Sequence, residues 1–145
     1  MNRKLQKWTM FMDFAHQIQT LSTCKRHATG VIIFPSDCSQ ILSVGFNGPA
    51  RGLPNDSCTG EMGQCGCSHA EINALLKLGT LQEQAVLYST VSPCVNCASA
   101  IINSQKIKLV VFDKLSRHEH RPLRMLEIAT IGWFYRGGLL EHLKG

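Results

Sequence analysis

The stretch that decides how this chain folds reads Cys67-Ser-His-Ala-Glu-Ile-Asn73, and Ser92-Pro-Cys-Val-Asn-Cys97 follows it. Together the two segments supply one imidazole and two thiols, with a carboxylate two residues after the histidine. Each segment is expected to begin a helix, and one apolar strand separates them. Unpaired backbone N–H groups at a helix N-terminus favour thiolates. The pair of segments therefore predicts two helix starts that converge on one metal ion.

The ligand types indicate zinc with a free coordination position. A structural zinc is closed by four protein ligands, whereas a catalytic zinc has three and keeps one position for water. His69, Cys94 and Cys97 make three. Zinc lowers the pKa of its bound water to about 7, and Glu71 can then accept and return a proton. H-x-E followed by P-C-x-x-C is typical of zinc-dependent nucleobase deaminases. The alternative is a zinc ribbon or knuckle, which has paired cysteines but no use for this carboxylate.

Length and composition predict one globular domain over residues 1–145, because 44% of the residues are hydrophobic and 17% are charged. No apolar run approaches the roughly 18–20 residues of a membrane span. The first residues lack the pattern of a secretory signal, so a cytoplasmic protein is expected. Seven cysteines are then metal ligands or reduced thiols. The net charge of +5 suits a phosphate-bearing substrate and also permits nucleic-acid binding.

Hydrophobic periodicity predicts alternating helices and strands. Helices are expected at residues 5–22, 69–78, 94–104 and 123–130, and strands at residues 29–34, 40–46, 85–90, 108–112 and 132–135. The turn-like residues 35–39 make the first two strands a hairpin, and residues 47–66 form a long glycine-rich loop. This order predicts an α/β fold with a mixed sheet covered by helices on both faces.

These residues resemble the deoxycytidylate (dCMP) deaminases of phages and bacteria, within the cytidine deaminase superfamily. The resemblance covers roughly residues 5–135 and rests on three parts: Ser22-Thr-Cys-Lys-Arg26 before Gly30-Val-Ile-Ile33, Val44-Gly-Phe-Asn-Gly48 with Arg51-Gly-Leu-Pro54 and Cys58, and His69-Ala-Glu-Ile-Asn-Ala74 with Ser92-Pro-Cys94. Pro49-Ala50 departs from the family, which usually has a small residue before the proline. The chain after Asp113 matches only loosely.

The resemblance implies a three-layer α-β-α fold with a five-stranded mixed sheet, and zinc ligands His69, Cys94 and Cys97. It also implies that Glu71 moves protons and that the backbone N–H of Ala70 meets the pyrimidine carbonyl. The region around Ser92 would receive the leaving amine. Asn47 would bond the sugar or base edge, although Asn-Gly is also a common turn dipeptide.

A 5′-phosphate pocket is implied as well, and Arg26 and Arg51 are the candidates for it. Guanidinium groups bind phosphate in a two-pronged geometry. The alternative for either arginine is an ordinary solvated side chain.

Four further cysteines are candidates for a second, structural zinc. Cys58, Cys65 and Cys67 crowd the end of the long loop, and Cys24 lies in the N-terminal segment that resembles the family. Four thiolates would close a structural site and pin the loop. Some phage-type deaminases resemble this arrangement. The alternative is a set of free thiols, with or without one disulfide. Cys38 stands apart in the hairpin turn and is expected to bind no metal.

The leading hypothesis is therefore an enzyme that hydrolyses dCMP to dUMP and ammonia for thymidylate synthesis. The resemblance also implies a hexamer with dCTP as activator and dTTP as inhibitor. Neither a membrane nor nucleic acid is expected as a partner, because the sequence has no apolar span and no aromatic and basic cluster near its C-terminus. Three other hypotheses stay open at this point. They are a tRNA adenosine deaminase, a deaminase of free cytosine, cytidine or a riboflavin precursor, and a noncatalytic zinc-binding module.

Overall fold

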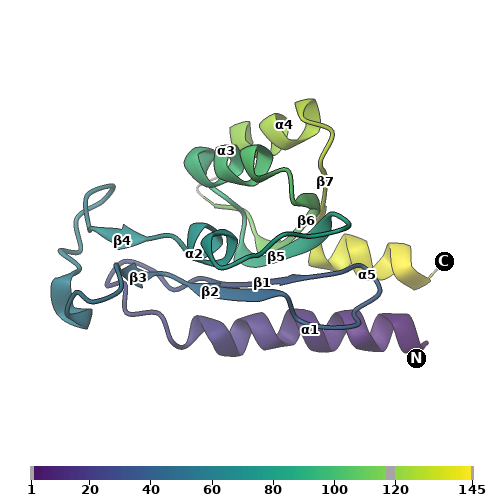
Figure 1. Ribbon diagram of the computed structural model, residues 1–145, viewed down its shortest axis with the longest axis horizontal. Coiled ribbons are helices and arrows are strands. Elements are labelled where there is room, and N and C mark those ends of the chain that lie inside the picture. Colours follow the sequence, from purple (N-terminus) through teal and green to yellow (C-terminus); the bar gives the residue numbers. More distant parts are fainter. Residues whose placement is uncertain (1, 117–119, 145) are drawn as a thin grey trace.

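The computed structural model describes residues 2–116 and 120–144, and a five-stranded sheet runs through its centre (Figure 1). The strands lie in the order β2-β1-β5-β6-β7. Their bounds are β1 Gly30–Phe34, β2 Ser43–Phe46, β5 Ala85–Val91, β6 Ile107–Lys114 and β7 Gly132–Tyr135. β1 pairs antiparallel with β2 and with β5, whereas β5, β6 and β7 are parallel. The sheet is mixed, as predicted.

Helices cover both faces of this sheet (Figure 1). On one face lie α1 Arg3–Gln19 and α5 Arg136–Lys144, and on the other lie α2 Ala70–Leu76, α3 Val95–Ser104 and α4 Arg121–Ile128. The three-layer α-β-α arrangement predicted from the sequence is therefore confirmed.

Burial of both faces explains the unbroken apolar run of β1. Successive side chains of a strand point to opposite faces. Val31 and Ile33 pack with α2, α3 and α4, whereas Ile32 and Phe34 pack with α1. All four are fully buried. A strand covered on both sides reads as continuously hydrophobic, and β1 does.

Gly45 of β2 lets α2 lie directly on the sheet. A Cβ built at this position would stand 2.2 Å from the backbone oxygen of Ala70 and 2.8 Å from the backbone nitrogen of Ala74. Both atoms belong to the α2 backbone, so no side-chain rotation would relieve the clash. Glycine is thus required where the strand approaches the helix that bears Glu71.

Two features of the chain were not expected from its sequence. The stretch predicted as one long loop, residues 47–66, contains strand β3 Gly48–Pro49 and the short 3-10 helix η1 Asn55–Ser57. β3 pairs with β4 Cys67–Ser68, which follows directly after this stretch. A fifth helix, α5, follows directly on β7. In the described residues, 2–116 and 120–144, no helix is long and apolar enough to cross a membrane.

Candidate active site and metal clusters

The histidine and two cysteines of the sequence motifs meet in space. His69 Nδ1 lies 3.6 Å from the Sγ of Cys94 and 3.3 Å from the Sγ of Cys97. The three ligand atoms lie within 4.8 Å of one another. Two ligands of a tetrahedral zinc, with Zn–S near 2.3 Å and Zn–N near 2.05 Å, stand about 3.6 Å apart. The observed spacing fits a zinc ion, and we call this set the catalytic cluster.

Helix starts hold the catalytic cluster as predicted. His69 is the N-cap residue of α2 and Cys94 is the N-cap residue of α3. The Sγ of Cys94 accepts a hydrogen bond from the backbone N–H of Cys97 at 3.5 Å. The Cys97 thiol and His69 also donate to it, and together they lower the pKa of Cys94 to about 3. Such a thiolate is ready to bind a metal, because ligands must lose their protons first.

Glu71 stands beside this cluster in the first turn of α2, and its side chain is buried. Burial in the low-dielectric interior raises its pKa to about 7. A carboxylate with such a pKa can both take up and release a proton near neutral pH. Glu71 therefore has the position and the acidity of a general acid–base group.

The remaining four predicted ligands form a second cluster. The Sγ atoms of Cys24, Cys58, Cys65 and Cys67 lie within 4.8 Å of one another. The Sγ of Cys58 accepts a hydrogen bond from the backbone N–H of Lys25 at 3.3 Å, which lowers the pKa of Cys58 to about 7. We call this set the cysteine cluster. Cys38 lies elsewhere, buried in the β1–β2 turn as expected.

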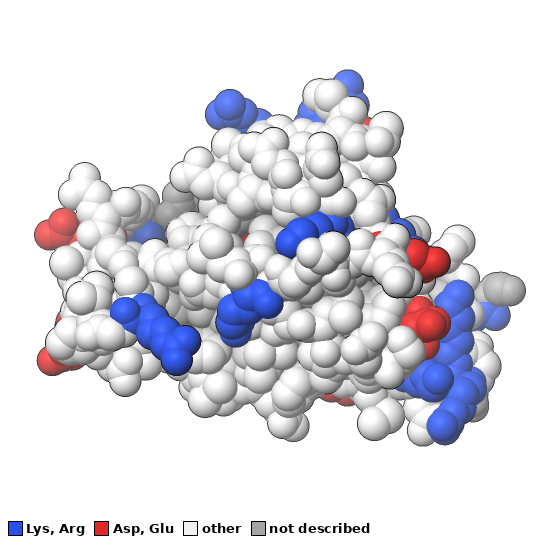
Figure 2. Space-filling model, in the orientation of Figure 1, with Lys and Arg blue, Asp and Glu red and all other residues white. Residues whose placement is uncertain are grey.

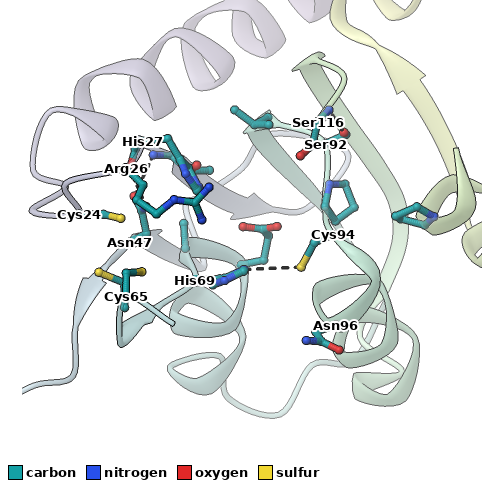
Figure 3. Close-up of a pocket in the computed structure, with 17 residues that line it drawn as sticks. Cys24, Arg26, His27, Asn47, Cys65, His69, Ser92, Cys94, Asn96 and Ser116 are labelled. Carbon is teal, nitrogen blue, oxygen red and sulfur yellow. Dashed lines mark hydrogen bonds between the residues drawn. The ribbon is translucent and has the colours of Figure 1, made fainter. Parts of the chain in front are cut away.

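One pocket opens onto both clusters (Figure 3). His69 and Cys94 lie next to each other on one side of it, and Arg26 and His27 project from the side opposite Cys94. Three more predicted substrate residues line it: Asn47, Ala70 and Ser92. Arg51 does not, because it is exposed in the turn after β3 and is absent from the pocket lining. Arg26 thus lies beside the catalytic cluster and Arg51 away from it.

The side-chain amide of Asn47 is engaged by the pocket wall itself. Its Oδ1 accepts from the backbone N–H of Thr29 at 2.9 Å, and its Nδ2 donates to the backbone oxygen of His27 at 2.8 Å. The two bonds hold the segment 27–29 against the end of β2. Asn47 therefore shapes the pocket in addition to lining it.

Ser92 has a comparable role on the opposite wall. Its Oγ accepts a hydrogen bond from the backbone N–H of Ser116 at 2.7 Å, and its backbone N–H donates to Lys114 at 2.7 Å. The end of β6 is thereby drawn to the pocket. Sequence reasoning did not identify several lining residues, because no spacing pattern links them to the metal motifs: His27, Asn96, Ser116 and Pro122.

Comparison with known proteins identifies the family. The family described as the cytidine and deoxycytidylate deaminase zinc-binding region matches residues 5–114, which is most of the chain and includes every residue of both clusters. This chain belongs to that family. It therefore contains a zinc-binding deaminase region, and the catalytic cluster is the candidate metal site.

Two curated relatives are deoxycytidylate deaminases of yeasts. The protein of Schizosaccharomyces pombe is 29% identical over 145 residues, and that of Saccharomyces cerevisiae is 29% identical over 133 residues. These alignments cover 90% and 83% of this chain but only 44% and 42% of the relatives. The chain thus spans less than half the length of either yeast enzyme.

A solved structure of similar length is the dCMP deaminase of the cyanophage S-TIM5 in complex with dCMP and dUMP. It is 26% identical in sequence, with a TM-score of 0.78. The alignment covers 93% of this chain and 98% of the phage protein. The likeness therefore extends over nearly the whole of both chains.

Proposed function

We propose that this protein is a zinc-dependent deaminase that hydrolyses dCMP to dUMP and ammonia. The dUMP would supply thymidylate synthesis. The observation that carries the proposal is the catalytic cluster with a buried carboxylate beside it. Three ligands at tetrahedral spacing leave one coordination position for water, and Glu71 stands where a proton must move. The phage relative that was solved with dCMP and dUMP supports the choice of substrate.

His69, Cys94 and Cys97 would hold the zinc ion in this proposal. When bound, the ion would lower the pKa of a water molecule to about 7 and so supply a nucleophile at neutral pH. Glu71 accepts one proton as the oxygen adds to C4 of the pyrimidine and passes it to N3. The second proton of the water is then transferred to the exocyclic amine. The bond between C4 and this amine breaks, and ammonia leaves. Two protons leave the water and two are delivered, so Glu71 ends the cycle ionised.

The pocket walls would bind and orient the nucleotide. The backbone N–H of Ala70, at the start of α2, is available to the pyrimidine carbonyl in this arrangement. Ser92, across the pocket, lies where the amine would depart. Asn47 would contact the sugar or base edge while it holds residues 27–29.

Arg26 is the better of the two proposed phosphate ligands, because it is half-buried in the pocket wall next to His27. A guanidinium there can bind a 5′-phosphate through two hydrogen bonds. Arg26→Ala should raise KM for dCMP and leave kcat at saturating dCMP nearly unchanged. Arg51→Ala is the matched control and should change neither. An equal effect of both variants would remove Arg26 from this role.

The test of the function is ammonia release from a panel of substrates. The panel contains dCMP, CMP, deoxycytidine, cytosine and an adenosine-containing tRNA anticodon stem, and zinc per chain is measured on the same sample. Turnover of dCMP alone is expected. Turnover of the RNA, or of unphosphorylated substrates only, would keep the zinc chemistry and overturn the substrate.

We infer that the cysteine cluster binds a second, structural zinc. Four thiols at mutual distances within 4.8 Å match the ligand set of a closed site. The cluster joins the segment at Cys24 to a loop with left-handed glycines at 60, 63 and 66. A metal would pin this loop, which has few buried side chains of its own.

Zinc stoichiometry tests this second site directly. The protein should contain two zinc ions per chain, and Cys58→Ser should contain one. Cys38→Ser is the matched control, since Cys38 is also buried but stands apart from both clusters, and it should keep two. One zinc per unsubstituted chain would refute the structural site and leave the catalytic one intact.

The proposed quaternary structure is a homo-oligomer, with a hexamer as the expected form and with dCTP and dTTP as the expected effectors. Sedimentation and assays of dCMP turnover with each triphosphate test these two points separately. A monomer would contradict the oligomer, and dCMP turnover that neither triphosphate changes would contradict the two effectors.

A further inference from the structure

A second hollow lies at the N-terminal end of α1, beside the turn that joins β1 to β2. It is open to solvent, has a volume of about 470 Å3 and is lined by seven residues: Arg3, Lys4, Lys7, Trp8, Ser36, Asp37 and Cys38. None of them lines the catalytic pocket. Figure 2 shows lysine and arginine side chains gathered at this end of the molecule, where Figure 1 places the N-terminus.

The cations at this hollow stand where a helix disfavours them. The N-terminus of α1 carries the positive end of the helix dipole and unpaired backbone N–H groups. Its first turn has no acidic residue, and Arg3, Lys4 and Lys7 occupy its first two turns. Asn2 caps it by accepting from the backbone N–H of Leu5 at 2.7 Å. A bound anion would offset the repulsion among these like charges.

A fourth cation reaches the same place from the sheet. The Nζ of Lys108, on β6, donates to the Oγ of Ser36 at 3.2 Å. The hydroxyl of Ser36 then keeps its own proton for another acceptor. Asp37 is the one acidic residue in the lining, and its carboxylate accepts from the backbone N–H of Ser39 at 3.0 Å. The lining therefore has three basic residues against one acidic residue, and Lys108 adds a fourth cation next to it through Ser36.

Trp8 adds a donor that lacks an acceptor. Its side chain is 3% exposed and lines the hollow, and its indole N–H has no hydrogen-bond partner among the described residues. A buried donor without an acceptor destabilises the folded protein, so such donors are uncommon. The N–H of Trp133 provides the contrast, because it donates to Glu127 at 3.2 Å.

We propose that this hollow binds a small oligophosphate anion, held by Arg3, Lys4 and Lys7 with the indole N–H of Trp8 as an additional donor. The inference is independent of the deaminase function, because it involves no residue of the catalytic pocket. An extended chain of phosphate groups suits the site better than one phosphate, because the cations come from two turns of α1 and from β6.

Titration with sodium tripolyphosphate at constant ionic strength tests the site, followed by the indole N–H signals in ¹⁵N–¹H spectra of the zinc-loaded protein. The chain has two tryptophans, and Trp133→Phe assigns the two signals. The Trp8 signal should shift saturably while the Trp133 signal stays in place. Orthophosphate should bind at least tenfold more weakly. Zinc per chain, measured before and after the titration, should not change.

Two double variants make the test specific. Lys4→Ala with Lys7→Ala should weaken binding at least tenfold and should fold normally, because it removes cations from the positive end of α1. Lys77→Ala with Arg51→Ala removes two exposed cations, at the end of α2 and in the turn after β3, and should weaken binding less than twofold. The proposal is overturned by an unmoved Trp8 signal, by equal weakening in both double variants, or by orthophosphate binding as tightly as tripolyphosphate.

Discussion

The catalytic cluster and the cysteine cluster are built in opposite ways. His69, Cys94 and Cys97 lie at the starts of two helices that pack on the central sheet, so their positions follow from the core. The cysteine cluster gathers its thiols from a loop and from the segment after α1. In the first case the fold holds the ligands, and in the second the ligands would hold the fold.

The number of ligands differs for the same reason. The catalytic cluster has three candidate ligands and a buried carboxylate beside them, so a bound zinc would keep one coordination position for water. The cysteine cluster has four thiols and no carboxylate within its set. A zinc site that keeps one coordination position for water suits catalysis, whereas a site with four protein ligands suits a structural role. The four predictions below separate these two roles, from the largest expected effect to the smallest.

Glu71→Gln should lower kcat for dCMP by about 10²- to 10⁴-fold, the usual contribution of a general acid–base group. The amide keeps the shape of the side chain but cannot accept the proton of the water. Zinc per chain should stay at the unsubstituted value, because Glu71 is not in the ligand set. Ammonia release and metal analysis on one sample check both points. Unchanged turnover would remove Glu71 from the mechanism.

Cys58→Ser should lower kcat/KM for dCMP by roughly 10- to 100-fold, the size of effect seen for groups that support a metal site indirectly. Cys24, Cys65 and Cys67 line the pocket, so a loosened loop would disturb one pocket wall. The catalytic zinc should remain. Limited proteolysis should now cut within residues 51–66. Protection equal to that of Cys38→Ser would show that no metal pins the loop.

Gly45→Ala should destabilise the whole protein by about 1–3 kcal/mol, because the added Cβ meets the backbone of α2. Gly79→Ala is the matched control, since the Cβ built there has no described atom within 4 Å. Urea unfolding measures both variants. Because the packing of α2 on the sheet positions the catalytic cluster, Gly45→Ala should also lower the zinc occupancy of that cluster. It should have no direct effect on the cysteine cluster. Equal stability of the two variants would contradict the close approach.

Gly66→Ala should have the smallest effect, about 1 kcal/mol, because alanine is strained in the left-handed conformation that Gly66 adopts at φ +83°. Gly66 lies between Cys65 and Cys67, and nothing described would meet the new Cβ. The strain should lower the affinity of the cysteine cluster for zinc about fivefold to tenfold and leave the zinc affinity of the catalytic cluster unchanged. Competition with a chromogenic chelator resolves the two affinities. A lower zinc affinity of the catalytic cluster alone would contradict this prediction, because it would show that Gly66 supports the other metal site.

Sequence reasoning succeeded where a periodic pattern reports on burial. The apolar runs of β1, β5 and β6 predicted buried strands because both faces of the sheet are covered. The Cys94-x-x-Cys97 spacing predicted neighbouring thiols, since residues three apart lie on one side of a helix. The predicted loop was only partly right, because two-residue strands such as β3 and β4 leave no periodic signal. Helix α5 was missed for another reason. Its Gly137-Gly138 pair disfavours helix, and packing of Leu139 against the sheet overrides that preference.

The sequence by itself determined the chemistry of this protein. Ligand types, their spacing and the nearby carboxylate are local properties, because they depend on residue identity and on the geometry of single helices. Tertiary structure alone decided which distant residues share the pocket. It brought Arg26 and His27 to the catalytic cluster and left Arg51 outside. It also brought the α1 cations together with Ser36 at the second hollow, where Lys108 bonds Ser36. Contacts between segments far apart in the chain depend on strand order and helix packing, which no local spacing encodes.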